Sequence, residues 1–363
     1  MSASIVEVVG VAYPVTWLPW AVLYFFLIGI SAGAFALSVP GVVLRKPGWY
    51  GISRRALLAA VLCAVTAPLA LVSDLHQPGR FLNFYLHSNF SSWMAWGAYF
   101  IPFYLLALLA YAWLAMCPTL GVLAAAGGAG ARWYRRLSLS GKDRRGAVIA
   151  AAFLAGVGAA LLLLYSGMEV MVVSARPLWR TPLLPLLFAV SGLSAAVGIV
   201  HLLDRILHMV DPDATRLLNR VLAATQLAVL AIFALWLALA LSGVSSTHAQ
   251  AWQQVAPVRE WRLMGAWLVV AAIVTLGLAT RRPQYGVLAG LFALLSAWSI
   301  RWALLIDGQA LSKIGPRYDP YHMPLGSDGW LGMLGISGLW VALFVVLISL
   351  LPWGNGASSR QGA

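Results

Sequence analysis

Long runs of apolar residues, rather than short alternating ones, dominate the pattern of this chain. Nine runs are each long enough for an α-helix to cross the hydrocarbon core of a bilayer, which takes about 20 residues. Apolar and polar positions do not alternate within the runs, so a lipid-spanning β-barrel is not indicated. The sequence therefore predicts an all-α polytopic membrane protein with about nine transmembrane helices, at residues 19–44, 53–74, 93–116, 147–168, 182–210, 214–243, 261–280, 284–306 and 330–352.

Two helical bundles are expected within one integral membrane unit. The first four predicted helices, within residues 1–168, should form an N-terminal bundle that carries the functional site, and residues 169–363 a second bundle with the C-terminal helix. Gly29 and Gly33 lie four residues apart in the first helix, a spacing that favours close helix packing. The longest connection, about 117–146, is expected to be a basic linker that lies on lipid headgroups or is simply solvated.

The positive charge of the chain is a signal of topology. A net charge of +13 could suggest nucleic acid, but the 24 basic residues fall mainly in alternate loops. Sixteen of them, Arg54 and Arg55 included, are assigned to one set of loops, and eight, Arg301 included, to the other. The positive-inside rule places the larger set in the cytoplasm, with the N-terminus on the periplasmic side and the C-terminus in the cytoplasm. The lipid bilayer, and not nucleic acid, is the expected partner of this charge.

The start of the chain and its cysteines bear on targeting and on metal chemistry. Residues 1–18 lack the positive region of a cleavable signal peptide, and Glu7 is their only charge. The first span is therefore expected to stay uncleaved. Cys63 and Cys117 show no CxxC spacing, so we expect neither a disulfide framework nor an iron–sulfur cluster held by this chain.

The most informative polar segment follows the second predicted span, in SDLHQPGRFLNFYLHSNFSSWMAW at 73–96. Asp74 and His76 lie where the helix ends, and Pro78 prevents it from continuing. A carboxylate beside an imidazole, at a pocket that faces lipid, suits the acceptance of protons from a hydroquinone. The plainer alternative is that Asp74 caps backbone amides while His76 contacts a lipid headgroup.

A second polar group, Tyr165, Ser166 and Glu169, ends the fourth predicted span. Tyr165 and Glu169 are four residues apart and therefore share a helix face. A phenol can donate a hydrogen bond to a quinone carbonyl, and a glutamate can accept a proton from the quinol. The plainer alternative is an interfacial tyrosine beside a glutamate that extends toward water.

The remaining histidines are weaker candidates. His201 and His208 are seven residues apart in the fifth span, which fits either an interhelical hydrogen bond or a proton path that also involves Arg301 and Asp307. His248 and His322 fall in outer loops and are expected to meet a partner or solvent. A membrane haem usually needs histidines that face each other from two helices, so haem is not expected.

Three motifs resemble the NrfD/PsrC family of quinone-reactive membrane subunits of polysulfide-reductase-type and tetrathionate-reductase-type molybdoenzymes. They are YFFLIGISAGAF in the first span, SDLHQPGRF followed by NFSSWMAWGAYF, and YSG at the end of the fourth. The resemblance covers roughly the first 210 residues. Nine spans and a length of 363 residues look more like the tetrathionate-reductase branch of the family.

The resemblance implies a quinone pocket in the first helical bundle, near the outer face. A four-cluster Fe-S subunit would dock there and connect the pocket to a periplasmic molybdopterin catalytic subunit. Tyr165 looks like the family tyrosine that binds a quinone carbonyl, and Asp74 and His76 look like the groups at the pocket entrance. The family's histidine and asparagine near the first span have no clear counterpart in VTWLPWAVLYFF.

Together, residues and resemblance predict a subunit of the bacterial inner membrane that oxidises menaquinol or ubiquinol and passes electrons to the Fe-S subunit. The chemistry on the terminal substrate would take place in another polypeptide, and no metal, haem or Fe-S cluster is expected in this one. A purely structural membrane anchor and a secondary transporter remain alternatives, although a transporter would place its polar groups at the bilayer midplane. The candidate proton acceptors are Asp74, His76 and Glu169, and the candidate quinone-binding residues are Tyr165, Ser166, Arg80 and Phe84.

Overall fold

The computed structural model describes residues 15–75, 77–128, 130–313, 318–351 and 353. Within these residues nine helices are long and apolar enough to span a membrane, as predicted, and the one β-type pairing is an isolated bridge between Leu311 and Tyr318. The all-α class is therefore confirmed. The long helices are α1 (Pro19–Val42), α2 (Tyr50–Asp74), α4 (Trp93–Ala126), α6 (Arg145–Met171), α7 (Leu183–Ile206), α8 (Pro212–Leu241), α10 (Arg259–Arg281), α11 (Gly286–Trp302) and α13 (Trp330–Leu350).

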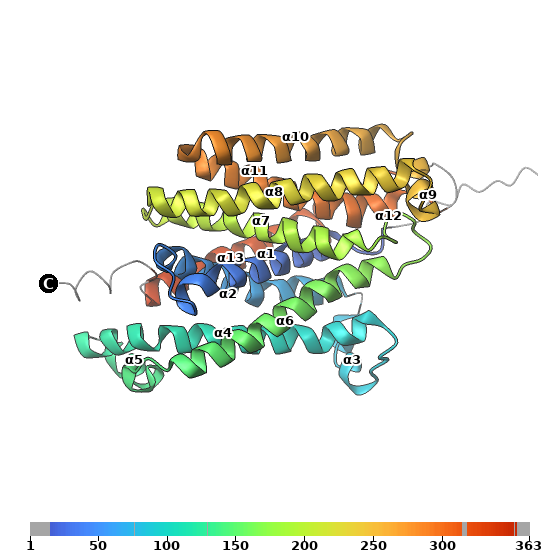
Figure 1. Cartoon of the computed structure of the whole chain (residues 1–363). Helices are drawn as coiled ribbons and strands as arrows, with labels where there is room; N and C mark the ends of the chain where they lie inside the picture. Colours follow the sequence, from blue (N-terminus) through green and yellow to red (C-terminus); the bar gives the residue numbers. More distant parts are fainter. Residues whose placement is uncertain (1–14, 76, 129, 314–317, 352, 354–363) are drawn as a thin grey trace, which may run out of the picture.

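Short helical elements occupy the connections. Figure 1 shows α3, α9 and α12 at one end of the bundle and α5 at the opposite end. The predicted linker 117–146 is largely helical, because α4 continues past Pro118 to Ala126 and α5 follows soon after. The short elements are η1 (Pro78–Arg80), α3 (Asn83–Leu86), α5 (Ala131–Leu137), η2 (Leu139–Gly141), α9 (Ser246–Val255), η3 (Pro283–Tyr285), the π-helical η4 (Ala303–Asp307) and α12 (Gly308–Ala310).

Helix α1 runs through the centre of the bundle and packs on α2 and α7 (Figure 1). Gly29 and Gly33 form the predicted small-residue face. A methyl group at Gly33 would lie 2.7 Å from the Cα of Leu193, and one at Gly192 would lie 2.7 Å from the Gly29 carbonyl oxygen. The α1 and α7 backbones therefore touch, which joins the first half of the chain to the second.

The α1–α2 hairpin is fixed by one serine. The Ser53 hydroxyl donates to the Leu37 carbonyl at 2.9 Å and accepts from the Gly41 amide at 2.9 Å. Both backbone groups belong to the last turns of α1, so Ser53 joins the start of α2 to the end of α1. A side chain at Gly41 would meet the Trp49 carbonyl at 2.6 Å, so the close turn requires glycine there.

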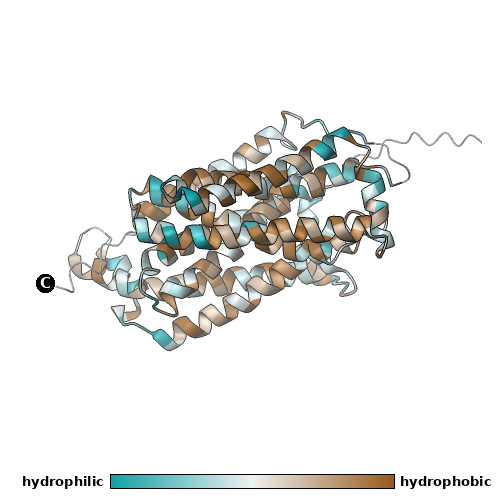
Figure 2. Ribbon diagram, turned by 45° about the horizontal axis from the view of Figure 1, so that its top comes forward, coloured by the Kyte–Doolittle hydropathy of each residue, from teal (hydrophilic) through white to brown (hydrophobic). Residues whose placement is uncertain are grey.

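The outward-facing surface of the bundle is apolar along most of its length. In Figure 2 the hydrophobic colour covers the helix sides, while hydrophilic residues gather mainly toward the two ends. Large exposed apolar areas of this extent are unusual on soluble proteins and suit contact with lipid. Exposed apolar residues on different long helices include Leu106, Phe153, Leu227, Ile273, Leu295 and Val341.

Three arginines that the charge pattern assigns to loops, Arg54, Arg55 and Arg301, are buried in helices instead. Arg55 forms an ion pair with Asp204 that links α2 to α7, with both side chains almost fully buried. Arg301 in α11 donates to the Phe25 carbonyl at 2.9 Å and to the Phe188 carbonyl at 3.1 Å. Arg54 donates to the hydroxyls of Tyr50 and Thr119. The loop assignment of these three residues is wrong, because each contacts partners inside the bundle.

The four weaker histidine candidates differ in burial and in hydrogen bonding. His201 is buried, and its Nε2 lies 3.0 Å from Asn219 Oδ1, which is the interhelical hydrogen bond of the plainer alternative. His208 lies beyond the end of α7 and is not part of the helix face that carries His201. His248 is buried, which makes the prediction of a partner or solvent contact wrong, and burial lowers its pKa so that the ring stays neutral at neutral pH. His322 is exposed, as predicted.

Candidate functional site: a cavity where α2 and α6 end

A cavity of about 220 Å³ lies at the end of the bundle that carries α3. The segment before α1, the ends of α2 and α6, the start of α4 and the loop with α3 all contribute to its wall. Val72 and Met94 in this wall are exposed, so the cavity opens to the surface. The wall comprises Trp17, Ala21, Phe25, Pro68, Leu71, Val72, Asp74, Leu75, Phe81, Phe84, Tyr85, Met94, Ala98, Ile101, Pro102, Tyr165 and Glu169.

Asp74 occupies the last position of α2 and reaches the start of α1. Its Oδ1 accepts a hydrogen bond of 3.0 Å from the amide of Leu18, the residue that caps α1. A carboxylate near a helix N-terminus is favoured by the positive end of the helix dipole. Asp74 therefore has the capping contact of the plainer alternative and also a place in the cavity wall.

Tyr165 lies in the last turns of α6 and is buried against α4. Gly97 provides the space for its ring, because a methyl group at Gly97 would lie 2.6 Å from the Tyr165 hydroxyl oxygen. The next turn of α6 is equally close to α7, since a side chain at Gly167 would clash with Pro185. Gly97 thus leaves room for the phenol, and Gly167 lets the end of α6 pack closely on α7.

Glu169 follows Tyr165 by one helical turn and also lines the cavity. Its Oε2 is buried and has no hydrogen-bond partner among the described residues. The same holds for the hydroxyl of Tyr24 in α1, and Tyr24, Tyr165 and Glu169 lie close enough to interact electrostatically. Buried polar atoms without partners are rare and often mark a position where a ligand or water binds.

Aromatic side chains form much of the remaining wall. Trp17 stacks on Trp179 with ring centroids 5.4 Å apart, and Gln309 fixes the backbone at Trp17. The Gln309 Oε1 accepts from the Trp17 amide at 3.0 Å, and its Nε2 donates to the Trp17 carbonyl at 3.0 Å. Tyr85, also in the wall, packs edge-on against Tyr99 with ring centroids 5.5 Å apart. Flat, apolar walls of this kind suit a ligand with a planar ring.

The structure brings together four of the seven predicted site residues. Asp74, Tyr165, Glu169 and Phe84 line the same cavity. Ser166 does not line it, because its hydroxyl is buried and donates to the Leu162 carbonyl at 2.7 Å. Arg80 lies in a neighbouring open depression of about 670 Å³, which shares Leu75, Phe81, Phe84 and Met94 with the cavity. His76 lies outside the described residues.

Sequence reasoning misses Trp17, Phe25 and Tyr24, which belong to an apolar stretch that indicates only a membrane span. A tyrosine hydroxyl within a span is a weak indication of an internal site, because it needs a partner away from water. Among the described residues no three His, Cys, Asp or Glu side chains gather in a way that could hold a metal ion. The carboxylates at the cavity are Asp74 and Glu169, and the phenols are Tyr85 and Tyr165.

Among the described residues, nine helices apolar enough to span a membrane form a bundle with a cavity at one end, which is the architecture of a polytopic membrane protein. Residues 7–312 match the family described as "Polysulphide reductase, NrfD", and the chain belongs to that family. It is a membrane subunit of the tetrathionate/polysulfide reductase type.

Its relatives include subunits of three reductases. The chain is 36% identical to a tetrathionate reductase subunit of Salmonella typhimurium over 99% of this chain and 98% of the relative. It is 22% identical to a selenate reductase subunit of Mesobacillus selenatarsenatis over 93% of this chain and 86% of the relative. A polysulfide reductase subunit of Wolinella succinogenes is 31% identical over 48% of this chain and 54% of the relative.

Proposed function

We propose that this chain is the quinol-oxidising membrane subunit of a periplasmic molybdoenzyme complex. It would oxidise menaquinol or ubiquinol in the cavity between α2 and α6 and pass the electrons to a four-cluster Fe-S subunit. The observation that carries the proposal is the meeting of Asp74, Tyr165 and Glu169 at one cavity that opens at the surface of an apolar bundle. The near full-length similarity to the Salmonella tetrathionate reductase subunit supports a terminal reductase of that kind.

Each group at the cavity has a task in this reaction. Oxidation of a quinol to a quinone releases two electrons and two protons, and the ring must be held while both leave. The Tyr165 hydroxyl would donate a hydrogen bond to one ring oxygen and so orient the ring. Asp74 and Glu169 would accept protons, because ionised carboxylates are bases within reach of the cavity. The electrons would leave toward the docked Fe-S subunit.

The proposed orientation places the cavity at the periplasmic face of the bacterial inner membrane. The opposite end of the bundle holds the basic turn between α1 and α2 and the basic residues of α5. Positive residues are retained in the cytoplasm, so the cavity end would face the periplasm, with the N-terminus periplasmic and the C-terminus cytoplasmic. Protons released at Asp74 and Glu169 would then leave outward, toward the same face as the partner subunits.

Tyr165→Phe tests the proposed site directly. We expect quinol-driven turnover of the purified complex to fall roughly tenfold, because one hydrogen bond to the ring is lost. Turnover driven by a reduced dye, which delivers electrons to the partner subunits, should stay at the wild-type rate. A hydroxyquinoline N-oxide inhibitor should block quinol-driven turnover of the wild-type complex and leave the dye-driven rate unchanged.

Tyr111→Phe is the matched control, since Tyr111 is a buried tyrosine of α4 whose hydroxyl lies 3.1 Å from the Ser38 hydroxyl, away from the cavity. It should leave both rates unchanged. A complex that is insensitive to the inhibitor and to Tyr165→Phe would instead be attached to the membrane by a purely structural anchor. A transport assay in liposomes would test the alternative of a secondary transporter.

Gly97→Ala should impair the site without removing any polar group. The added methyl group would lie 2.6 Å from the Tyr165 hydroxyl oxygen and must displace the ring. We expect the KM for quinol to rise and quinol-driven turnover to fall by about as much as in Tyr165→Phe. Gly335→Ala in α13 is the matched control, because an added Cβ there meets nothing within 4 Å. Equal activity of Gly97→Ala and wild type would show that the position of the Tyr165 ring is unimportant.

A further inference from the structure

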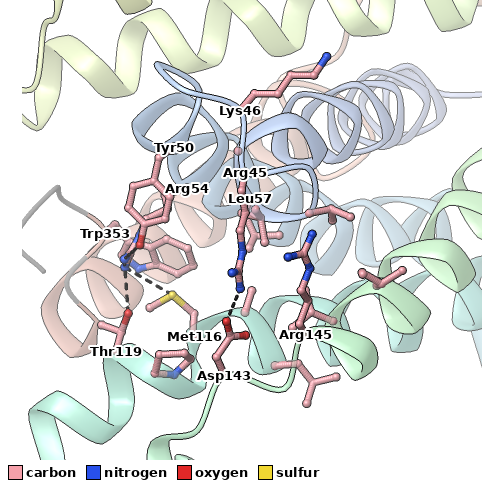
Figure 3. Close-up of a pocket in the computed structure, with 18 of the residues that line it drawn as sticks. Arg45, Lys46, Tyr50, Arg54, Leu57, Met116, Thr119, Asp143, Arg145 and Trp353 are labelled. Atoms are coloured by element: carbon pink, nitrogen blue, oxygen red, sulfur yellow. Dashed lines mark hydrogen bonds and ion pairs between the residues drawn. The ribbon is translucent and has the colours of Figure 1, made fainter. Parts of the chain in front are cut away.

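A second cavity, of about 460 Å³, lies at the opposite end of the bundle from the quinol site. It is bordered by the α1–α2 turn, the last third of α4 and the start of α6 (Figure 3). The proposed function does not use it. Its wall comprises Gly41, Val42, Val43, Arg45, Lys46, Pro47, Gly48, Tyr50, Arg54, Leu57, Leu114, Ala115, Met116, Pro118, Thr119, Asp143, Arg145, Val148, Ile149 and Trp353.

Positive charge dominates the rim of this cavity. Among the described residues that line it, four are cations and one, Asp143, is an acid. Figure 3 shows Arg45 directed at Asp143, with which it forms an ion pair, and the guanidinium of Arg145 beside them. The side chain of Lys46 points away from this group. The rim therefore keeps a net positive charge after the Arg45–Asp143 pair is counted.

Arg54, one of these four cations, lies deeper in the cavity, one turn into α2. Its side chain is only 5% exposed, although it lies at the end of a membrane-spanning helix. Hydrogen bonds to the Tyr50 hydroxyl at 3.0 Å and to the Thr119 hydroxyl at 3.4 Å orient its guanidinium. An arginine held in this way at the edge of the apolar region is a suitable binding group for an anion.

The backbone of the α1–α2 turn presents Arg45 to the cavity. Arg45 adopts a left-handed conformation with φ of 52°, which residues other than glycine seldom adopt. The turn is closed by a hydrogen bond of 2.9 Å from the Lys46 amide to the Pro40 carbonyl. The position of the guanidinium is therefore set by the turn and not only by a flexible side chain.

The inner wall of the cavity is apolar. Leu57, Leu114 and Val148 come from three different spans, and Trp353 closes the cavity beside them. The cavity thus has a cationic rim at the end of the bundle and an apolar wall, which includes the exposed Ile149. Inorganic phosphate would use the rim alone, whereas a phospholipid would use both parts.

We propose that this cavity binds an anionic phospholipid. Its phosphodiester would contact Arg45, Arg54 and Arg145, and its acyl chains would follow the apolar wall. Basic pockets between transmembrane helices are recurrent sites for such headgroups. The lipid would add a connection between the α1–α2 hairpin and the helices α4 and α6, at the end of the bundle where the exposed Arg45–Asp143 pair lies.

Native mass spectrometry of the delipidated complex tests the proposal, with dioleoyl phosphatidylglycerol and dioleoyl phosphatidylcholine as probes. The wild type should retain phosphatidylglycerol and not phosphatidylcholine. Arg45→Gln combined with Arg145→Gln should lower the retained phosphatidylglycerol roughly tenfold, because two contacts between charges are lost. Both side chains are exposed, so the fold does not depend on their burial. Asp143→Asn should raise the retained amount, because a competing carboxylate is removed.

Arg281→Gln combined with Arg282→Gln is the matched control, since it removes the same charge from exposed residues outside the cavity wall. It should retain as much phosphatidylglycerol as the wild type. An equal loss of phosphatidylglycerol in both double variants would mean that the overall positive charge attracts the lipid. That result would overturn the proposed site. Displacement of the lipid by inorganic phosphate at a modest excess would assign the rim to free phosphate and overturn the lipid proposal. Quinol-driven turnover, measured in parallel, reports separately on the cavity between α2 and α6.

Discussion

Asp74→Asn will reduce quinol-driven turnover by roughly a hundredfold, which is the usual contribution of a positioned proton acceptor. Asparagine keeps the oxygen that accepts the Leu18 amide at the start of α1, so the local structure should persist. It loses the charge and the basicity that the proposed reaction requires. The measurement is turnover of the purified complex with a reduced quinol analogue, compared with turnover driven by a reduced dye.

The dye-driven rate distinguishes two causes of a lower quinol-driven rate. If it stays at the wild-type level, the defect lies between quinol and the electron-transfer subunit. If both rates fall together, Asp74 serves assembly through its contact with Leu18, and the proposed proton acceptance is wrong. Asp213→Asn is the matched control, because Asp213 is an exposed acid in the first turn of α8 and is not part of the cavity wall. It should leave both rates unchanged.

The largest effect on stability is expected at the buried ion pair between Arg55 and Asp204. Arg55→Met leaves the Asp204 carboxylate in the bundle without its cation, and both side chains are almost fully buried. Removal of one partner from a buried pair destabilises proteins by about 3 kcal/mol or more. The midpoint of thermal unfolding in detergent should therefore fall clearly, and the protein yield should fall with it.

Two variants test whether the unpaired charge of Asp204 causes the loss of stability. Arg55→Met combined with Asp204→Leu removes both charges and should recover much of the lost stability, since a pair of apolar side chains suits this environment. Arg216→Met makes the same substitution in an exposed ion pair with Asp213, and such pairs contribute little. An unchanged midpoint in Arg55→Met would contradict the importance of the pair.

The spans could be predicted because lipid leaves an apolar run few alternatives to a helix. The meeting of Asp74 and Tyr165 also follows from topology, since the second and fourth crossings end on the same side of the membrane. Gly29 and Gly33 indicated the close helix contact by their spacing. These features depend on local patterns and on the number of crossings, which a sequence shows directly.

The other parts of the site depend on helix rotation and on partners distant in sequence. Helix α1 is apolar nearly all round, so its sequence does not show that Tyr24 and Phe25 face the interior. The charge pattern assigns Arg55 and Arg301 to loops because their partners, Asp204 in α7 and the carbonyls of Phe25 and Phe188, lie far away in sequence. Arg80 is close to Asp74 in sequence, yet η1 turns it into the neighbouring depression.

The hydrogen bonds between Gln309 and Trp17 determine when the wall of the cavity can be completed during synthesis of the protein. Residue 309 lies at the end of the eighth described span and is translated after the first seven, so the hydrogen bonds that hold Trp17 cannot form before then. The first helices can insert and pair early, but the wall of the cavity between α2 and α6 stays incomplete until most of the polypeptide has been made. If the proposed function holds, a ribosome-bound intermediate would therefore lack a finished quinol site.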